Sequence, residues 1–318
     1  MEDGDFPDPP TLTSSRLPAS GHDPVLLAEV LSCLDIADGK VFVDCTTGRG
    51  GHSLAIASRL GSTGQLLCLD ADPRNLEFAR QRLNHHSASS PARFFHANFA
   101  ELPDVLAAAK VPAVDGILAD LGISTNQLFD SAYGLSFSSD MPLDMRVDPR
   151  TPQSAADLIN TLREEDLANV LYNLAQERYS RRIAKKIVES RRASPILTTG
   201  RLADLVRAAI PRRGGAPEKI DPATRTFLAL RMAVNQELEN LEALLKQTPK
   251  LLNSGGRFAV ISFQSMEDRL VKQAFRALEM TQPDAYTILT SRPLSPAAEE
   301  LSANPRSRSA KLRAIARK

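Results

Sequence analysis

The sequence predicts an α/β fold: a parallel sheet interrupted by an all-helical insertion. Three observations support this prediction. Between residues 22 and 120, short apolar runs alternate with segments of helical spacing; residues 154–209 contain no strand-like run; and an apolar run returns at residues 258–263. Alternating strands and helices are typical of parallel strands joined by right-handed crossovers.

The first part of the chain supplies most of the expected sheet. Strand-like runs occupy residues 41–43, 66–69, 93–95 and 116–119, and helical spacing occupies residues 53–60, 74–83 and 102–109. Residues 1–20 carry four acids in their first ten positions and four prolines, and they lack an apolar period. This composition predicts a disordered leader that takes no part in the fold.

The character of the chain changes after Asp120. A loop rich in Gly, Ser and Asp runs to about residue 150, and loops of this length are usually functional or mobile. Helices are expected at residues 154–160, 164–175, 177–192 and 199–209, followed by one long helix over residues 223–247. We therefore expect a first domain part at residues 21–135, a helical insertion at 136–220, and a second domain part at 221–318 that ends in a basic tail.

Composition narrows the class of protein. The 318 residues carry 39 Lys and Arg against 38 Asp and Glu, and 42% are hydrophobic, so a disordered polymer is excluded. The chain has no run of about 18 apolar residues, as a membrane span requires, and no signal peptide. The three cysteines show no paired CxxC spacing, so we expect no metal site; Cys45 and Cys68 read as small buried hydrophobes. The setting could be bacterial or organellar, but the leader contains acids and only one Arg before residue 20, which argues against a transit peptide and for the bacterial cytoplasm.

A glycine-rich turn follows the first expected strand, in the sequence Val41-Phe42-Val43-Asp44-Cys45-Thr46-Thr47-Gly48-Arg49-Gly50-Gly51-His52-Ser53. A dinucleotide fingerprint would need a third glycine where Ser53 stands, and a P-loop would need a Gly-Lys pair. Both fit poorly. A nucleoside-like cofactor without a pyrophosphate remains, and S-adenosylmethionine is the commonest of these.

Acids and an aromatic residue stand at the ends of the following strands. Asp70 ends the second strand and could accept both ribose hydroxyls, although it could instead cap the next helix. Phe99 follows the third strand and could lie against adenine or belong to the core. Asp120 ends the fourth strand and should face the crevice in which open α/β sheets bind ligands.

A series of motifs runs from about residue 22 to the C-terminus: His22-Asp23-Pro24-Val25-Leu26-Leu27, Thr47-Gly48-Arg49-Gly50-Gly51-His52-Ser53, Asp120-Leu121-Gly122-Ile123-Ser124, Pro142-Leu143-Asp144-Met145-Arg146, Pro222-Ala223-Thr224-Arg225-Thr226-Phe227, Glu267-Asp268-Arg269 and Asn304-Pro305-Arg306. In this order the motifs resemble those of the ribosomal RNA small-subunit methyltransferase H family, which methylates cytosine N4 in the decoding region.

The resemblance implies a Rossmann-like S-adenosylmethionine-dependent methyltransferase sheet, with the insertion at 136–220 recognising the substrate. It implies a small-subunit rRNA cytidine as substrate and no metal or membrane; a homodimer is left open. The implied cofactor-binding residues are Gly50, Gly51, His52, Asp70, Phe99, Asp120 and Gln127.

Methyl transfer to an exocyclic amino group needs acceptors for its N–H groups. By its place at the end of the fourth strand, Asp120 is the first candidate, and Asp144 in the long loop is the second; Asp144 could alternatively be a turn residue. The target base must also leave its stack. Tyr133, Phe137 and Met141 could form a wedge for that purpose, or they could simply anchor the loop.

Basic residues concentrate in two segments of this nearly neutral chain. The expected helix at 177–192 and the last 14 residues carry clusters that would neutralise phosphates without reading sequence. The predicted RNA-binding residues are Arg178, Arg181, Arg182, Lys185, Lys186, Arg306 and Arg308.

Gln264 stands where the family usually has His, and glutamine cannot take a proton. This departure motivates an alternative, a catalytically silent cofactor-binding protein that acts in ribosome assembly. A nucleotide-dependent oxidoreductase is disfavoured by the missing third glycine.

Overall fold

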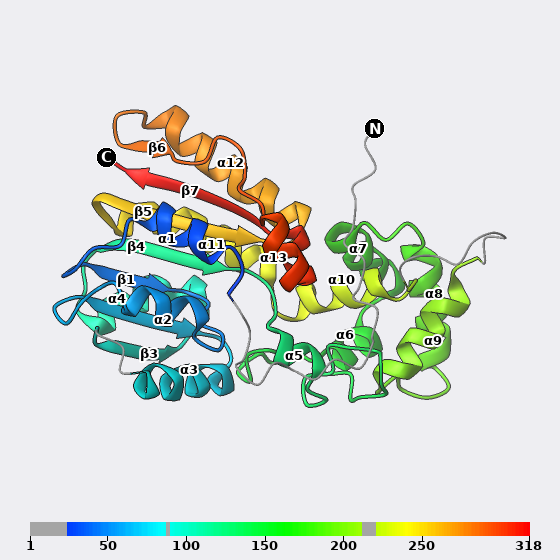
Figure 1. Ribbon diagram of the computed structural model, residues 1–318. Helices are drawn as coiled ribbons and strands as arrows, with labels where there is room; N and C mark the ends of the chain where they lie inside the picture. Colours follow the sequence, from blue (N-terminus) through cyan, green and yellow to red (C-terminus); the bar gives the residue numbers. More distant parts are fainter. Residues whose placement is uncertain (1–23, 87–89, 212–220) are drawn as a thin grey trace. The chain divides into compact units, whose positions relative to one another are not determined.

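A computed structural model describes residues 24–86, 90–211 and 221–318 (Figure 1). The expected leader at residues 1–20 and the motif residues His22 and Asp23 lie outside these ranges. The chain divides into two compact units: unit 1 comprises residues up to Gly122 and from Leu238 onward, and unit 2 comprises Ile123–Glu237. Unit 2 is longer than the expected insertion at 136–220, because both the loop after Ile123 and the helix after Ala223 pack into its core.

Unit 1 is built around a seven-stranded sheet with the order β3-β2-β1-β4-β5-β7-β6. Its strands are β1 (Val41–Asp44), β2 (Gln65–Asp70), β3 (Ala92–His96), β4 (Val114–Asp120), β5 (Leu252–Ser262), β6 (Tyr286–Ile288) and β7 (Lys311–Arg317). β1 to β5 are parallel, as predicted, and their order is that of a doubly wound, Rossmann-like sheet. β7 pairs antiparallel with both β5 and β6.

Helices cover both faces of this sheet. The helices of this unit are α1 (Leu27–Leu34), α2 (Gly51–Ala57), α3 (Pro73–His85), α4 (Leu102–Ala109), α11 (Glu237–Gln247), α12 (Ser265–Thr281) and α13 (Ala298–Ala303), with 3-10 turns η1 (Phe99–Glu101), η2 (Thr248–Leu251) and η3 (Pro305–Ser309). The buried residues of α1, α2 and α3 pack on one face, and those of α4, α11 and α12 pack on the other.

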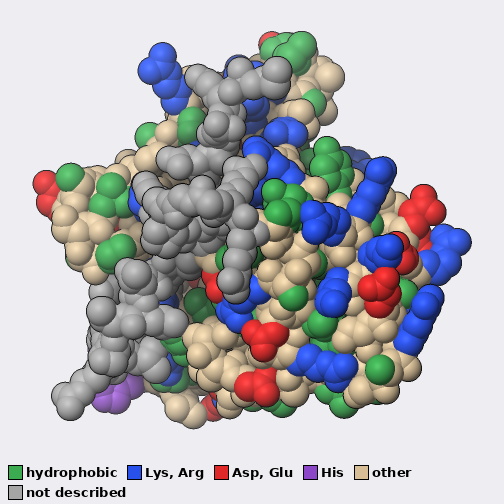
Figure 2. All heavy atoms as spheres, turned by 90° about the vertical axis from the view of Figure 1, so that its right-hand side faces the viewer, with side chains coloured by type: hydrophobic (Ala, Val, Ile, Leu, Met, Phe, Trp, Pro, Cys, Tyr) green, Lys and Arg blue, Asp and Glu red, His purple; other side chains and the backbone are tan. Residues whose placement is uncertain are grey.

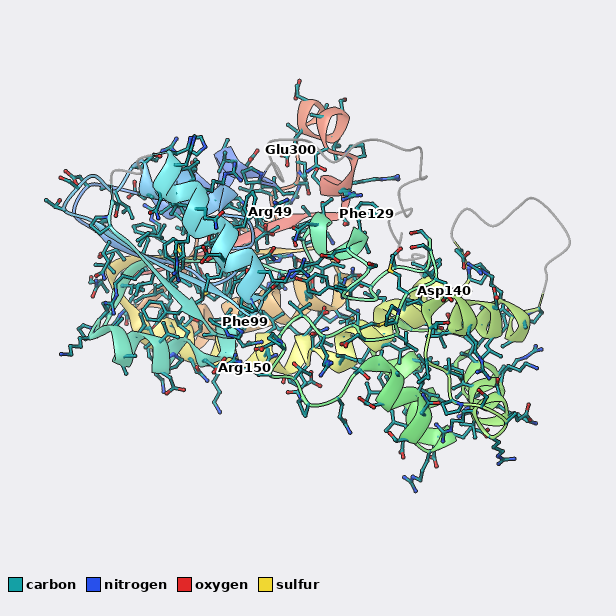
Figure 3. The ribbon with its side chains drawn as sticks, turned by 90° about the horizontal axis from the view of Figure 1, so that it is seen from below. Arg49, Phe99, Phe129, Asp140, Arg150 and Glu300 are labelled. Carbon is teal, nitrogen blue, oxygen red and sulfur yellow. The ribbon has the colours of Figure 1, made fainter. Side chains whose placement is uncertain are left out.

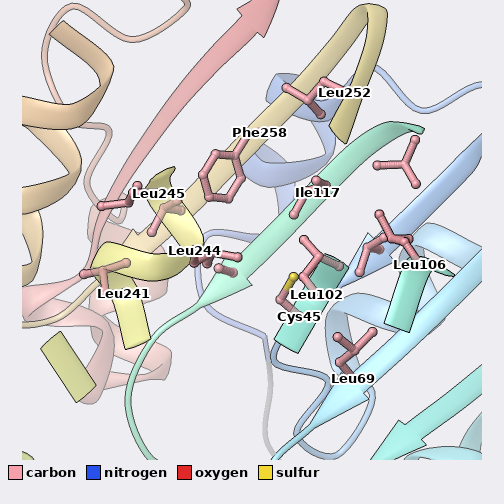
Figure 4. Packing of buried hydrophobic residues seen from close by; sticks show 14 of the residues in the cluster. Cys45, Leu69, Leu102, Leu106, Ile117, Leu241, Leu244, Leu245, Leu252 and Phe258 are labelled. Carbon is pink, nitrogen blue, oxygen red and sulfur yellow. The ribbon is translucent and has the colours of Figure 1, made fainter. Parts of the chain in front are cut away.

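Successive residues of each central strand belong alternately to the apolar clusters on the two faces of the sheet. Phe42 and Leu66 belong to one apolar cluster, whereas their neighbours Val43 and Leu67 belong to the other, because successive side chains of a strand point to opposite faces. Figure 4 shows the cluster under α4 and α11, where the ring of Phe258 lies 5.6 Å from that of Phe275 between centroids. Burial on both faces explains why these strands read as continuous apolar runs.

The described part of unit 2 is helical apart from a bridge between Pro142 and Thr198, with α5 (Thr125–Phe129), α6 (Ala155–Thr161), α7 (Glu164–Ala175), α8 (Ser180–Arg191), α9 (Thr199–Ala209) and α10 (Thr224–Val234). Its helices enclose a separate apolar core that includes Leu171, Ile183, Val206 and Leu230. The loop before α6 is tied to this bundle: Asp140, labelled in Figure 3, accepts a hydrogen bond of 2.8 Å from the N–H of Gly200 in α9.

The prediction of a single helix over residues 223–247 is wrong. This segment forms two helices, α10 and α11, which are separated at Asn235 and Gln236, where Gln236 has a φ of 49°. The Asn235 side chain is held by the backbone of the long loop, since it donates to the Met145 carbonyl and accepts from the Val147 N–H. These contacts and the turn at Gln236 outweigh an apolar spacing that continues across the break.

Other expected boundaries also shift. α2 begins at Gly51 rather than at residue 53, and the basic helix begins at Ser180 rather than at 177. β5 starts at Leu252 and includes Gly255, at a φ of 78°, near a shift in its register with β4. The burial of Cys45 and Cys68 is confirmed, and it raises the pKa of both thiols.

Candidate active site at the strand ends

Three acids lie at one edge of the sheet. Asp44, Asp70 and Asp120 are the last residues of β1, β2 and β4, and β1 is the neighbour of both other strands. Parallel neighbours end at the same edge, so the three carboxylates gather there, as the sequence predicted for Asp70 and Asp120. Open α/β sheets bind ligands at this edge.

The glycine turn connects β1 to α2 beside these acids. Gly50 has a φ of 79°, and a Cβ placed on it would lie 3.1 Å from both Ala79 Cβ and Leu83 Cδ1. A side chain at this position would therefore meet both backbone strain and contact with α3. The bare turn places the main chain of Gly48 next to the end of β2, where its N–H donates to Asp70 Oδ2 over 2.6 Å.

Asp70 is fixed by backbone donors. Oδ2 accepts from Gly48, and Oδ1 accepts from the Asp72 N–H over 2.8 Å. The first turn of α3 is capped by Asp72, which accepts from Arg74, so the alternative role of Asp70 as helix cap is wrong. Each carboxylate oxygen has a second acceptor position, and the pair therefore fits two hydroxyl donors. Burial raises the pKa of Asp70 to about 7, against the lowering effect of these N–H groups.

Asp44 was not singled out from the sequence, although it ends its strand as Asp70 and Asp120 do. Its Oδ2 accepts from Ser53 Oγ over 2.6 Å, and its Oδ1 accepts from the Thr46 N–H over 3.2 Å. Thr46 Oγ1 in turn accepts from the Asp120 N–H over 2.6 Å. This network joins the ends of β1 and β4 to the first turn of α2. Burial raises the pKa of Asp44.

His52 and Asp120 form the least satisfied part of the site. Nε2 of His52 lies 3.6 Å from Oδ2 of Asp120, and the side chains are 7% and 22% exposed. Both ring nitrogens of His52 and Oδ1 of Asp120 are buried without a hydrogen-bond partner among the described residues. Buried polar atoms without partners are costly, so these atoms fit a polar ligand.

Phe99 opens the short 3-10 turn after β3 and is labelled in Figure 3. A capping box fixes this turn, because Asn98 accepts from Ala100 while Glu101 accepts from Asn98. The ring is partly buried and packs against the apolar cluster under α4. Both sequence interpretations of Phe99, core residue and ring platform, are compatible with this position.

Two candidate residues lie in unit 2. Gln127 is 3% exposed, and its Oε1 accepts from the Ser124 N–H in the capping box of α5. Asp144 is paired with Arg146, whose Nε and Nη2 lie 2.7 and 2.8 Å from its two oxygens. Burial raises the pKa of Asp144, but the hydrogen bonds from Arg146 lower it by more. The pKa of Asp144 therefore lies below its ordinary value.

The side chains of Tyr133, Phe137 and Met141 anchor the long loop that precedes α6. Tyr133 and Met141 are 6% and 5% exposed, and the ring of Phe137 packs edge-on against Phe227, with 4.7 Å between centroids. The wedge suggested for these residues would need an exposed side chain. The alternative sequence interpretation, a loop fastened to the helical core, describes them better.

The predicted RNA-binding side chains of the helical unit are exposed: Arg178, Arg181, Arg182, Lys185 and Lys186. Figure 2 shows Lys and Arg side chains spread over the face turned to the viewer, with Asp and Glu scattered among them. Arg191 in the same helix has a structural role instead, because its guanidinium donates to the carbonyls of Ile159 and Leu162.

The prediction of a basic C-terminal tail is wrong. Residues 311–317 form β7, an internal strand of the sheet. Arg313 is 8% exposed, and its Nε lies 2.6 Å from Oδ1 of Asp268 on α12, so this arginine is engaged inside the protein. Of the two predicted RNA-binding residues before β7, Arg308 is exposed and Arg306 is partly buried.

Gln264, the departure from the family pattern, is the N-cap of α12. It forms a capping box with the buried Glu267, which accepts from the backbone N–H groups of Phe263 and Gln264 over 2.9 and 3.0 Å. This role needs a hydrogen-bonding side chain and no proton transfer.

Within the described ranges, no group of three or more His, Cys, Asp or Glu side chains is arranged to hold a metal ion. The same part of the chain contains no helix long and apolar enough to cross a membrane.

The Rossmann-like sheet, with its glycine turn and gathered strand-end acids, defines the chain as an S-adenosylmethionine-dependent methyltransferase. More particularly, the chain belongs to the MraW methylase family, which it matches over residues 19–318.

Curated relatives extend along nearly the whole chain. The ribosomal RNA small subunit methyltransferase H of Solibacter usitatus is 47% identical over 294 residues, which is 92% of this chain and 99% of the relative. The proteins of the same name from Acidobacterium capsulatum and Syntrophobacter fumaroxidans are each 46% identical. They cover 93% and 94% of this chain, and 98% and 97% of their own lengths.

Proposed function

We propose that this chain transfers a methyl group from S-adenosylmethionine to the exocyclic N4 of a cytidine in the decoding region of 16S-type rRNA. The substrate is the assembled or nearly assembled small subunit, and the reaction takes place in the bacterial cytoplasm. The observation that carries the proposal is the similarity to small-subunit rRNA methyltransferases over almost the entire chain. The strand-end acids are consistent with this chemistry.

The cofactor residues proposed are Gly50, Gly51, His52, Asp70, Phe99, Asp120 and Gln127. Asp70 would accept the two ribose hydroxyls at the positions its backbone donors leave open. Phe99 would contact the adenine ring, and the glycine turn would admit the cofactor close to the main chain. When bound, the cofactor supplies an electrophilic methyl group on a sulfonium.

The protein must make the amino nitrogen of cytosine nucleophilic. Its lone pair is delocalised into the ring, so an acceptor has to engage the N–H groups and then take one proton. We assign this role to Asp120, whose Oδ1 is buried and unpartnered. Asp144 is the weaker candidate, because Arg146 occupies both of its oxygens and lowers its pKa.

Unit 2 is proposed to position the RNA, with residues 136–220 as its substrate-recognition part. Arg178, Arg181, Arg182, Lys185 and Lys186 are exposed and suited to phosphate contacts, and Arg306 and Arg308 are proposed to add to them from unit 1. Such contacts fix orientation and affinity, whereas selection of one cytidine depends on the shape of the subunit around it.

The test is methylation of small subunits from cells that lack this gene, with isotope-labelled cofactor and mass spectrometry of the digested nucleosides. We expect label in N4-methylcytidine from one decoding-region position. Label in another nucleoside would contradict the N4 assignment. Cofactor binding by calorimetry without transfer would instead support the alternative of a silent assembly factor.

A further inference from the structure

The carboxylates of Asp44 and Asp120 differ in their hydrogen bonding, and the buried imidazole of His52 lies beside Asp120. Asp44 has both oxygens engaged, one by Ser53 Oγ and one by the Thr46 N–H. Asp120 has its N–H fixed by Thr46 Oγ1, but its Oδ1 is buried without a hydrogen-bond partner among the described residues. The available carboxylate partner for the ring is therefore Asp120, at 3.6 Å from Nε2.

The cost of this arrangement indicates a function. A buried donor or acceptor left unsatisfied costs about 1 to 3 kcal/mol, and three such atoms meet here. The separation of 3.6 Å is longer than a good hydrogen bond, but hydrogen bonds between catalytic groups commonly tighten when substrate is in place. Both side chains come from rigid elements, α2 and the end of β4.

Resting on the methyl transfer proposed above, we propose that His52 is the positioning residue for the proton acceptor: its Nε2–H donates to Asp120 Oδ2 and holds Oδ1 for the amino group of the target cytosine. In this reaction the N4–C bond forms while the S–CH3 bond breaks, and the electron pair of that bond goes to sulfur. The positive charge on N4 is removed when one N–H proton passes to Oδ1 of Asp120. His52 keeps its own proton throughout.

His52 is also one of the proposed cofactor residues, so the substitutions are compared at saturating cofactor, where only the positioning role affects kcat. In His52→Gln the amide nitrogen can reach the place of Nε2, so the donor to Asp120 is kept. His52→Leu has similar bulk but no donor, and His52→Asn has a donor that is one carbon too short. The matched control is His85→Leu, at an exposed position near the end of α3.

The experiment measures kcat and KM for small subunits, cofactor affinity by calorimetry and melting temperature for each purified full-length variant. We expect kcat to fall about 10- to 100-fold in the Leu and Asn variants, the effect of losing a hydrogen bond to a charged group. In the Gln variant kcat should return to within about threefold of wild type. Because kcat is measured at saturating cofactor, a change in cofactor affinity does not enter this comparison, and His85→Leu should resemble wild type.

Two results would overturn the inference. The first is an unchanged kcat in His52→Leu. The second is a Gln variant as slow as the Leu variant. If Leu lowers the melting temperature severely, the comparison of Gln with Asn decides alone. An inactive wild type would refute the proposed function itself, which keeps the two failures distinct.

Discussion

Asp70 combines two roles at the scale of a single residue, since it holds the glycine turn and offers acceptors at the sheet edge. We predict that Asp70→Ala weakens S-adenosylmethionine binding by about 2 to 4 kcal/mol, because acceptors for two hydroxyls are lost from a buried site. Calorimetry measures the effect. Asp104→Ala, an exposed acid in the first turn of α4, is the control and should bind normally. Equal affinity in both variants would reject the ribose assignment.

The pKa of Asp70 leads to a pH prediction. Burial raises this pKa to about 7, so near neutral pH the free protein carries the carboxyl partly protonated. Hydroxyl donors favour the ionised form, so binding lowers the pKa and releases a proton. Cofactor affinity should therefore rise as pH increases toward about 7 and then level off.

Calorimetry in buffers of different ionisation enthalpy detects this release. Asp70→Asn, which cannot titrate, should abolish the Asp70 contribution to both the released proton and the slope. Wild-type affinity that stays constant between pH 5.5 and 8 would contradict the mechanism.

Site residues show what a sequence can predict at this scale. The strand ends of Asp70 and Asp120 followed from apolar runs that stop at a carboxylate, and the structure gathers them. The hydrogen bonds of Asp44 with Ser53 could be expected from a similar strand end. The missing partners of His52 could not, because they depend on how three separate segments pack.

At the scale of elements, the basic residue Arg313 of β7 stabilises the fold through an ion pair instead of serving as an RNA contact. Arg313 and Asp268 form an ion pair in which the side chains are 9% and 13% exposed, with Lys311 at 3.6 Å from the same carboxylate. We predict that Arg313→Ala lowers the free energy of unfolding by about 3 kcal/mol, because it leaves Asp268 poorly compensated. Urea titration measures this loss. Arg292→Ala, at an exposed loop position, should change stability by less than about 0.5 kcal/mol.

The basic face of α8 should act through charge alone. Replacing Lys185 and Lys186 together with Glu should weaken RNA binding and reduce the slope of log affinity against log salt by at least about 1 unit, since two phosphate contacts are lost. Cofactor affinity should stay unchanged. The matched control exchanges the exposed Lys246 and Lys250 for Glu. If both double variants lose the same salt dependence, the footprint is not on α8.

Elements were predictable where local pattern and tertiary environment agree. β1 and β4 are buried on both faces, so their apolar runs identified them. β7 was missed because Lys311, Arg313 and Arg317 read as a solvated tail. The carboxylate that partners Arg313 inside the protein lies 45 positions earlier in the chain. Likewise, the break at Gln236 depends on contacts of Asn235 with a loop 90 positions away.

At the scale of the whole molecule, the proposed cofactor residues lie mostly in unit 1. A ligand that binds only the folded state at 100 times its Kd adds about 2.7 kcal/mol of stability. We predict that the product S-adenosylhomocysteine raises the melting temperature. Hydrogen exchange should show the new protection around residues 44–53 and 70–72, more than in α6 to α9. Protection confined to unit 2 would contradict this placement.

The two-unit organisation was expected from the absence of strand-like runs between residues 154 and 209, and the structure divides the chain accordingly. The sequence placed the limits of the insertion inside those found, because the segment before residue 136 reads as a loop and the helical pattern after residue 223 reads as part of one helix of the second domain part. Packing of Ile123 and Leu128 at one end and of Phe227 and Leu230 at the other assigns these segments to the core of unit 2.

The separation of β4 from β5 has a consequence for biosynthesis. These strands are direct neighbours in the sheet, yet the whole of unit 2 lies between them in the chain. At a synthesis rate of about 5 to 20 residues per second, β4 must wait on the order of ten seconds for its partner to be made. During that interval β4 can pair with β1, but its other edge lacks a partner, and an unpaired apolar edge is a ready template for aggregation. Chaperone protection of the first 120 residues should therefore matter more for the yield of this protein than for one whose sheet is encoded without interruption.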